Sequence, residues 1–248
     1  MEIPEKMTKI LYAVGDSFTF GQELIKDEAR PKYYEQTEVE RQRCYIGLLA
    51  KKLNVEQINA ARPGGSNQFM YRRMLTDVSD LLTKYSPNEI FVMVGFTYVG
   101  RREFFKTNGN VFDFLPNWEP SSPDPGYDLW HLLTRDFSSD YADFAFDQMM
   151  LLGVQNFLRV NNIPFLLSWS LRHDSLSKTE ATIIPETIIK QRCLLNRWYD
   201  QSFMNFTFLN KFPRGPGGHP LDEAHIAWAD LLYDYIQKNN LLSNEDVC

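Results

Sequence analysis

Cysteine is scarce in this sequence, and the cysteines present are not arranged for a disulfide framework or a metal. Three occur among 248 residues, Cys44, Cys193 and Cys248, and no two of them form a Cys-x-x-Cys pair. An odd number of widely separated cysteines argues against disulfide staples and against thiolate metal sites. We therefore expect a protein of a reducing compartment that holds no metal ion.

Long hydrophobic runs are also missing. The apolar run closest to the N-terminus, Ile10–Val14, is shorter than the hydrophobic core of a signal peptide. No later segment reaches the roughly 18 consecutive apolar residues that a membrane-spanning helix requires. The sequence thus predicts a soluble, cytoplasmic protein with no membrane partner.

Positive charge is low, since 26 lysines and arginines stand against 32 aspartates and glutamates, for a formal net charge of -6. A protein that binds duplex nucleic acid normally has a basic patch, so nucleic acid is not an expected partner. The glycine motifs that cradle nucleotide phosphates are absent, and no cofactor is expected. The G-x-S-x-G elbow of the α/β-hydrolases is absent too.

What the sequence does contain is a large apolar fraction arranged in short runs. Hydrophobic residues make up 44% of the chain and aromatic residues 14%, which is enough to bury a sizeable core. Short β-rich runs alternate with longer stretches of helical spacing, and wholly apolar runs suit parallel strands that are covered on both faces. This pattern predicts an α/β fold with a mostly parallel sheet between two helix layers. The expected strands are Ile10–Val14, Val55–Ile58, Ile90–Val94, Pro164–Trp169 and Phe206–Leu209.

The expected helices are Glu38–Leu53, Asn67–Lys84, Ser138–Asn161, Glu186–Tyr199 and Leu221–Lys238. In the last of them, His225, Ala229, Leu232 and Ile236 recur at helical spacing and form one stripe that should face the sheet. Two insertions, near residues 23–40 and 104–136, interrupt the alternation. Such insertions wall a substrate pocket in some α/β folds and are surface excursions or oligomer contacts in others. Nothing marks a second domain, so we expect one domain over residues 1–248.

Residues suited to catalysis follow several of the expected strands. Gly15-Asp16-Ser17 comes directly after the first strand, where a serine can be exposed at the carboxyl edge of the sheet. The same tripeptide is also typical of a simple turn and helix cap. Gly64 lies in a glycine turn after the second strand and could direct a backbone N–H at an oxyanion. Thr97 follows the third strand, and His219 precedes the last helix, so these residues could meet at one edge.

In the order of these blocks, the sequence resembles the SGNH (GDSL-type) serine hydrolases, a family of esterases and lipases with a flavodoxin-like α/β/α fold. The resemblance extends over nearly the whole chain. It implies that Ser17 is the nucleophile, that His219 is the base, and that Gly64 and Ser17 form an oxyanion hole with their backbone N–H groups, with Thr97 in the place of the family's asparagine. The implied activity is ester hydrolysis through an acyl-enzyme, without a cofactor. Its substrate would be a small-molecule or carbohydrate ester, such as an acetylated sugar.

Two positions depart from the family pattern. Pro216 stands where the family has an aspartate three residues before the catalytic histidine, so another acceptor, such as a backbone carbonyl, has to orient His219. Thr97 can still donate a hydrogen bond in place of asparagine, although over a shorter reach. These departures also support a second interpretation, a catalytically silent domain of the same fold that binds a carbohydrate or a protein partner.

The last block contains a rival base. Asp222 and His225 spell Asp-x-x-His, and residues three apart on a helix can touch. His225 lies on the buried stripe, however, whereas His219 lies in a loop that is free to reach Ser17, so His219 is the preferred base. A metal site built from His219, Asp222 and His225 would have no established ligand spacing.

Other polar and aromatic residues near these blocks have a more ordinary interpretation. Arg101 and Arg102 directly follow Thr97 and could hold an anionic group, but a solvated pair is the more usual arrangement. His173, after the fourth expected strand, is a reserve candidate for a role in the site. The aromatic residues of the second insertion could wall a pocket, although such clusters more often hold an insertion together.

Overall fold

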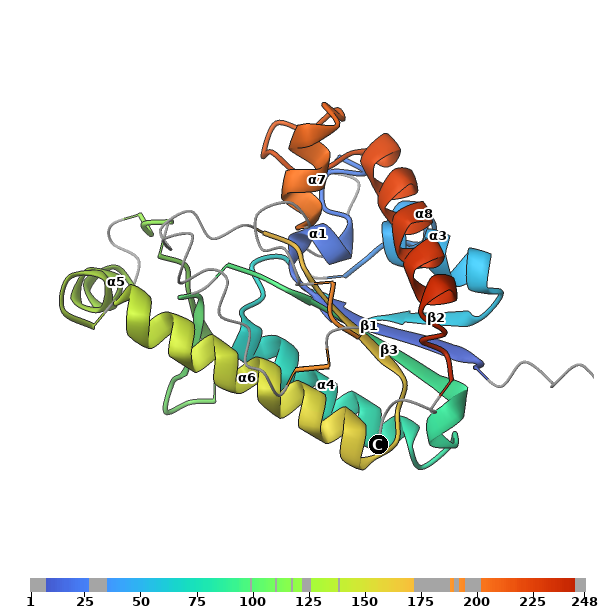
Figure 1. Ribbon diagram of the computed structural model, residues 1–248. Coiled ribbons are helices and arrows are strands. Elements are labelled where there is room, and N and C mark those ends of the chain that lie inside the picture. Colours follow the sequence, from blue (N-terminus) through green and yellow to red (C-terminus); the bar gives the residue numbers. More distant parts are fainter. Residues whose placement is uncertain are drawn as a thin grey trace, which may run out of the picture.

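The centre of the protein is a four-stranded parallel sheet (Figure 1). A computed structural model describes residues 8–26, 35–98, 100–109, 111–116, 118–121, 126–137, 139–171, 188–189, 192–194 and 202–243. The strands, in their order across the sheet, are β2 (Glu56–Asn59), β1 (Ile10–Gly15), β3 (Ile90–Phe96) and β6 (Phe165–Trp169). Because all four strands run in one direction, their carboxyl ends lie at the same edge of the sheet.

Helices cover both faces of the sheet (Figure 1). On one face lie α4 (Asn67–Leu81) and α6 (Asp140–Val160), and on the other lie α3 (Tyr45–Leu53) and α8 (Asp222–Lys238). This arrangement confirms the predicted α/β fold with helices on either side of a mostly parallel sheet. Three short helices complete the second face: α1 (Ser17–Phe20), α2 (Glu38–Arg43) and α7 (Phe203–Leu209).

The central strands form because their side chains are apolar on both faces. Every residue of β1 and β3 is buried. Alternate residues of a strand point to opposite faces, so Tyr12 and Val14 join the core beneath α4 and α6, while Leu11 and Ala13 join the core beneath α3 and α8. Full burial of a large apolar side chain contributes about 1.5–3 kcal/mol. These two cores therefore fix the strand ends on which the residues of the site stand.

One predicted strand is wrong. The segment Phe206–Leu209 belongs to helix α7, not to the sheet. The hydroxyl of Ser202 accepts the N–H of Asn205 and caps this helix, and the rings of Phe203 and Phe206 both pack against Trp228 of α8. A spacing of three residues places both rings on one helix face. The four-residue run Phe206–Leu209, taken alone, is too short to distinguish a strand from one helical turn.

Two predicted helices also differ from the structure. The stretch Glu38–Leu53 contains two helices that meet at Cys44, whose backbone is extended. A methyl group on Gly47 would lie 1.8 Å from the carbonyl oxygen of Arg41, so the tight junction requires glycine there. The predicted helix Glu186–Tyr199 falls largely outside the described residues, and within it Cys193 forms a parallel bridge with Leu167 of β6.

The second insertion has regular structure of its own. It contains an antiparallel hairpin, β4 (Arg102–Phe105) and β5 (Val111–Phe114), followed by helix α5 (Tyr127–Leu132) and a π-helical turn, Leu133–Phe137. The hairpin and α5 lie beyond the carboxyl edge of the sheet (Figure 1). No helix in the described part of the chain combines the length and the apolar character needed to cross a membrane.

One carboxylate lies deep between α6 and the hairpin. Asp147 is 3% exposed, and the closest atom of Arg102, Nη1, lies 3.8 Å from its Oδ1. Burial raises the pKa of Asp147 from 3.8 to about 7, although the positive charge of Arg102 acts against this shift. The folded protein therefore holds a proton that the unfolded chain releases at about pH 4. Its contribution to stability is present below that pH and is lost as the pH rises toward 7.

We expect the Asp147→Asn variant to remove this pH dependence, because an amide does not ionise. The melting temperature of the variant, relative to the wild type, should rise between pH 5 and pH 8. The underlying free-energy difference changes by up to about 1.4 kcal/mol per pH unit. Thermal unfolding followed by circular dichroism measures this difference. Asp80→Asn, on the exposed side of α4, is the control and should show no such trend. A pH-independent difference for Asp147→Asn would contradict the argument.

Candidate active site

Ser17 stands at the carboxyl end of β1, as the first residue of α1. The side chain of Asp16 accepts the N–H of Phe18 at 3.0 Å and caps this short helix. A methyl group on Gly15 would lie 2.1 Å from Oγ1 of Thr19, so the turn into the helix requires glycine at that position. Asp16 is thus the helix cap, which leaves the hydroxyl of Ser17 available. Ser17 lines a cavity of about 1030 Å³.

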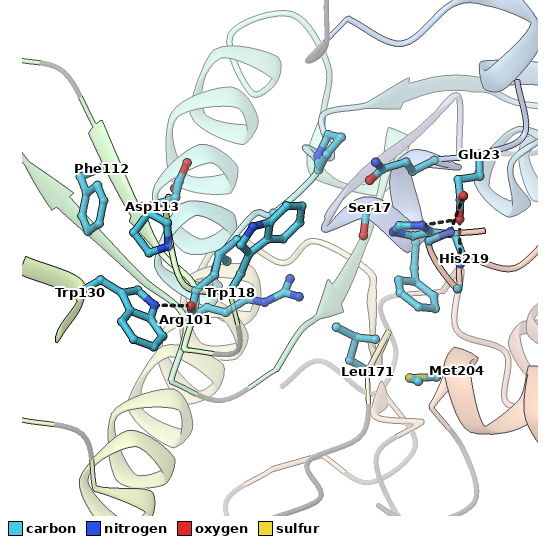
Figure 2. Close-up of a pocket in the computed structure, with 18 of the residues that line it drawn as sticks. Ser17, Glu23, Arg101, Phe112, Asp113, Trp118, Trp130, Leu171, Met204 and His219 are labelled. Carbon is cyan, nitrogen blue, oxygen red and sulfur yellow. Dashed lines mark hydrogen bonds and ion pairs between the residues drawn. The ribbon is translucent and has the colours of Figure 1, made fainter. Parts of the chain in front are cut away.

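His219 lines the same cavity, and its ring is held by a carboxylate that the sequence analysis did not identify. Nδ1 of His219 lies 2.8 Å from Oε2 of Glu23, and a dashed line marks this contact in Figure 2. Glu23 belongs to the loop after α1, where its backbone has a left-handed conformation. The ring of His219 also packs against Phe18, the neighbour of Ser17, with 5.4 Å between ring centroids. The segment from α1 to the loop that follows it therefore contributes Ser17 and the two side chains that contact the ring of His219.

The loop that carries His219 is shaped around the carboxylate of Glu23. Oε1 accepts the backbone N–H of Gly217 at 2.7 Å, and Oε2 accepts the backbone N–H of His219 at 3.0 Å. A methyl group on Gly215 would lie 2.6 Å from the carboxyl carbon of Glu23, and one on Gly217 would lie 3.1 Å from Oε2. The glycines of this loop are therefore what lets Glu23 approach the ring.

The electrostatics of this contact favour an ionised Glu23. Partial burial acts to raise the pKa of the Glu23 carboxyl, but the N–H groups of Gly217 and His219 and the ring of His219 lower it below its ordinary value. A carboxylate at Nδ1 selects the tautomer with the proton on that nitrogen and leaves Nε2 as a proton acceptor. The sequence analysis left the group that orients His219 open, with a backbone carbonyl as one example, and in the structure the acceptor at Nδ1 is the carboxylate of Glu23.

Two of the residues that line the cavity, Ser17 and Gly64, follow the neighbouring strands β1 and β2. Gly64, after β2, lines the cavity with a left-handed backbone at φ +72°. Among the described residues, the N–H groups of Gly64 and Ser17 have no hydrogen-bond partner. Unpartnered N–H groups near a nucleophile are the components of an oxyanion hole. The structure therefore brings Ser17, Gly64 and His219 to one cavity, as their placement at strand ends and loops predicted.

Thr97 is arranged differently from the expectation. It is fully buried behind Asp16, and its hydroxyl donates to Oδ2 of that aspartate at 2.6 Å. Its backbone N–H donates to Oδ1 of Asn67 at 2.9 Å. Thr97 is absent from the described residues that line the cavity. Because its single hydroxyl proton is already donated to a buried carboxylate, the structure does not show the expected direct contact of Thr97 with the reaction centre.

The expectation that Arg101 and Arg102 form a solvated pair is wrong. The side chain of Arg102 is 15% exposed and binds Asp143 of α6. The side chain of Arg101 is 18% exposed, lines the cavity, and donates from Nη1 to the hydroxyl of Thr97 at 2.8 Å. The pattern suggested solvation because two adjacent cations usually face water. In the structure Arg102 packs against α6, and Arg101 lies beside Thr97 and Asp16.

The rival base is a core residue. His225 is 1% exposed, its Nδ1 accepts the backbone N–H of Tyr45 at 3.0 Å, and burial lowers its pKa to about 3. Asp222 binds Arg43 through both carboxylate oxygens. His219, Asp222 and His225 therefore have separate partners, and no group of three or more His, Cys, Asp or Glu side chains in the described residues is placed to hold a metal ion. The predicted buried stripe of His225, Ala229, Leu232 and Ile236 is confirmed.

The second insertion forms one wall of the cavity. The residues that it contributes are Lys106, Phe112, Asp113, Leu115, Trp118, Pro120, Ser121 and Trp130. Of the two interpretations of this segment, the pocket wall agrees with the structure. The first insertion supplies Glu23, while its residues 27–34 lie outside the described part of the chain. The reserve candidate His173 also lies outside the described residues.

Comparisons with solved structures identify the same fold. A structure titled TesA aligns with a TM-score of 0.55 and 12% identity, over 93% of this chain and 99% of that one. A carbohydrate esterase family 2 enzyme with a carbohydrate-binding domain, from Corynascus thermopiles (Myceliophthora fergusii), aligns with a TM-score of 0.52 and 14% identity, over 97% of this chain and 69% of that one. Identities this low establish likeness of fold alone.

A member of the lipolytic protein G-D-S-L family from Veillonella parvula DSM 2008 also aligns, with a TM-score of 0.46 and 13% identity, over 93% of this chain and 97% of that one. No curated protein matches the sequence. A family model described as a family of unknown function (DUF6071) matches residues 22–247. The matched range begins after Ser17 and includes both Glu23 and His219.

The contact between Glu23 and His219 predicts how reactive Ser17 is. We expect Glu23→Gln to slow the labelling of Ser17 by a fluorophosphonate by up to about 10⁴-fold, the loss seen when a triad carboxylate becomes an amide. The rate of labelling, followed by mass spectrometry of the intact protein, measures the effect.

Asp222→Asn is the matched control, because it removes the carboxylate of the rival pair. Asp222 and Arg43 are each 41% exposed, so their ion pair contributes at most about 1 kcal/mol to stability. The control should therefore fold normally and label at the wild-type rate. If Asp222→Asn is labelled slowly and Glu23→Gln is labelled at the wild-type rate, the carboxylate that activates Ser17 is Asp222 and not Glu23.

Proposed function

This chain belongs to a family of unknown function (DUF6071), and we propose that it is a serine hydrolase that cleaves a carboxylic ester through an acyl-enzyme. The observation that carries the proposal is the contact of 2.8 Å between Nδ1 of His219 and Glu23, at the cavity that Ser17 also lines. A nucleophile, a base and a carboxylate that orients the base are the three parts of a catalytic triad.

The reaction begins with proton transfer from Ser17 to His219. Glu23 holds the proton on Nδ1 of the imidazole, so Nε2 accepts the proton of the Ser17 hydroxyl as Oγ attacks the carbonyl carbon of the ester. The tetrahedral intermediate carries a negative charge on the former carbonyl oxygen. The backbone N–H groups of Ser17 and Gly64 donate to that oxygen. Glu23 stays ionised throughout and stabilises the imidazolium that forms.

The reaction is completed in two stages, formation of the acyl-enzyme and its hydrolysis by water. His219 returns its proton to the leaving alcohol oxygen, the ester bond breaks, and the acyl group remains on Oγ of Ser17. A water molecule next attacks the acyl carbon while His219 accepts one of its protons. The second tetrahedral intermediate collapses as His219 returns this proton to Oγ of Ser17, the bond between the acyl carbon and Oγ breaks, and the carboxylic acid leaves. These steps require only residues of this chain and water.

The walls of the cavity support a carbohydrate ester, such as an O-acetylated sugar, as the substrate. Phe112, Trp118 and Trp130 present aromatic surface to the cavity next to the charged side chains of Lys106 and Asp113. The side chain of Trp118 is 70% exposed, so a large flat ring stands at the cavity wall in contact with solvent. Apolar walls with a few polar groups are typical of small-molecule sites. A sugar ring has one apolar face and polar edges, which suits this combination.

The alternative of a catalytically silent domain depended on two departures from the family pattern, Pro216 and Thr97. Pro216 leaves the C-terminal loop without a carboxylate to orient the histidine, and the structure answers this first departure. Glu23 supplies this carboxylate from the opposite end of the chain. The contact of this carboxylate with the histidine ring supports the catalytic interpretation.

Removal of the hydroxyl of Ser17 should abolish activity. We expect Ser17→Ala to lose measurable turnover of p-nitrophenyl acetate and all labelling by a fluorophosphonate, while its melting temperature stays close to that of the wild type. Ser79→Ala, on the exposed side of α4, is the matched control and should behave like the wild type in both assays. Equal turnover by the wild type and Ser17→Ala, without labelling of either, would refute the serine mechanism and favour the binding domain.

A further inference from the structure

Arg101 brings a positive charge to the cavity that the mechanism above does not use. Its side chain is 18% exposed and lines the cavity together with Ser17. Figure 2 shows its guanidinium directed into the cavity, toward the side on which Ser17 lies. Burial of a charged group is costly unless the group is paired or has a function. The contacts of Arg101 therefore decide between a structural and a functional role.

The contacts within the protein occupy only part of the guanidinium. Nη1 donates to the hydroxyl of Thr97 at 2.8 Å and lies 3.6 Å from Oδ2 of Asp16. A guanidinium carries five N–H donors, and within the described residues the hydrogen bond to Thr97 is the only one that the guanidinium of Arg101 makes. Asp16 has closer partners than Arg101, namely the hydroxyl of Thr97 and the N–H of Phe18. The remaining guanidinium donors have no hydrogen-bond partner in the described part of the protein, and the side chain that carries them lines the cavity.

The topology places these donors beside the other two candidate donors for an oxyanion. Ser17 follows β1, Gly64 follows β2, and Arg101 follows β3. These three strands are neighbours in the sheet, in the order β2-β1-β3. Their carboxyl ends are at one edge, so the donors approach the cavity from three adjacent strand ends. Thr97 lies behind Arg101, with its hydroxyl between the guanidinium and Asp16.

We propose that Arg101 is a catalytic residue whose guanidinium donates to the oxyanion of the tetrahedral intermediate, and that Thr97 and Asp16 are positioning residues that hold it. This assignment rests on the proposed ester hydrolysis. The SGNH resemblance implied that the side chain of Thr97 donates to the oxyanion. In this assignment Arg101 supplies a charged donor there instead. A charged donor strengthens its hydrogen bond as negative charge develops on the oxygen, so its effect is larger in the transition state than in the ground state.

Two variants of Arg101 separate the donor from its charge. Arg101→Met fills a similar volume without any donor, and Arg101→Gln keeps a neutral amide donor. On p-nitrophenyl acetate we expect kcat of Arg101→Met to fall about 10²–10³-fold, the usual effect of losing one oxyanion donor. Arg101→Gln should fall less, and KM should change little in both. The substrate is neutral, so a fall in kcat alone indicates a contact made in the transition state.

An anionic ester tests the competing role, in which Arg101 binds a negative group of the substrate. The mono-p-nitrophenyl ester of succinate carries a carboxylate that p-nitrophenyl acetate lacks. The proposal is overturned if Arg101→Met raises KM for the succinate ester alone and leaves kcat for the acetate ester unchanged. A fall in kcat of similar size on both esters supports it. Arg135→Met, at a side chain that is 76% exposed, controls for the loss of one positive charge and should match the wild type.

Variants of Thr97 test the positioning role. Thr97→Val removes the hydroxyl between Arg101 and Asp16, and we expect a fall in kcat with little change in KM. Thr97→Ser keeps the hydroxyl and should restore kcat, which a purely structural role of the side-chain volume would not produce. These variants leave Arg101 in place, so they test the assignment even if the Arg101 variants fail to fold, which thermal unfolding reveals. A wild-type kcat for folded Thr97→Val would contradict the positioning role.

Failure of this inference can be told apart from failure of the proposed function. A wild-type protein that neither turns over esters nor reacts with a fluorophosphonate refutes the hydrolase itself. A wild-type protein that does both, with the same kcat as folded Arg101→Met, refutes only the role of Arg101.

Discussion

The geometry of the cavity depends on one contact, between the carboxylate of Glu23 and Nδ1 of His219 at 2.8 Å. The same carboxylate accepts two backbone N–H groups from the loop that carries the histidine. These bonds fix the loop and the ring together, so the position of His219 does not depend on the loop's own sequence alone. A hydrogen bond to a charged acceptor is roughly twice as strong as a neutral one, which explains how one side chain can order this glycine-rich segment.

Asp16 is a second carboxylate that holds several groups together at the carboxyl edge of the sheet. Asp16 caps α1 through the N–H of Phe18, accepts the hydroxyl of Thr97, and lies near the guanidinium of Arg101. The chain segments that follow β1 and β3 are thus held at one charged group. Two acidic residues that flank α1, Asp16 before it and Glu23 after it, therefore determine how the later parts of the chain meet Ser17.

Most of the fold could be predicted from the sequence because the central strands are apolar on both faces. The runs at Ile10–Val14 and Ile90–Val94 correspond to β1 and β3, and glycine and serine residues after the strands indicated where the site lies. Phe206–Leu209 was predicted as a strand because a run of four residues does not distinguish alternation from one helical turn. In that segment the packing of Phe203 and Phe206 on Trp228 decided the outcome.

The contacts that complete the site are long-range, and no local pattern encodes them. Glu23 and His219 are 196 residues apart, and a carboxylate in a polar loop looks like any solvated glutamate. The glycines before His219 were a usable signal, since they leave room for another side chain to approach. Thr97 was assigned to the oxyanion by its position in the chain, but its hydroxyl proton goes to Asp16, a fact that depends on how neighbouring strand ends pack.

The close approach of Gly215 and Gly217 to the carboxyl group of Glu23 limits how this protein can change during evolution. A side chain larger than hydrogen at position 215 would occupy the space of the Glu23 carboxyl group, and position 217 leaves little more room. The acid and these glycines therefore form a unit whose members have to be exchanged together. A homologue that carries an aspartate three residues before its histidine would be released from this coupling, and both its N-terminal loop and its C-terminal loop could then diverge independently.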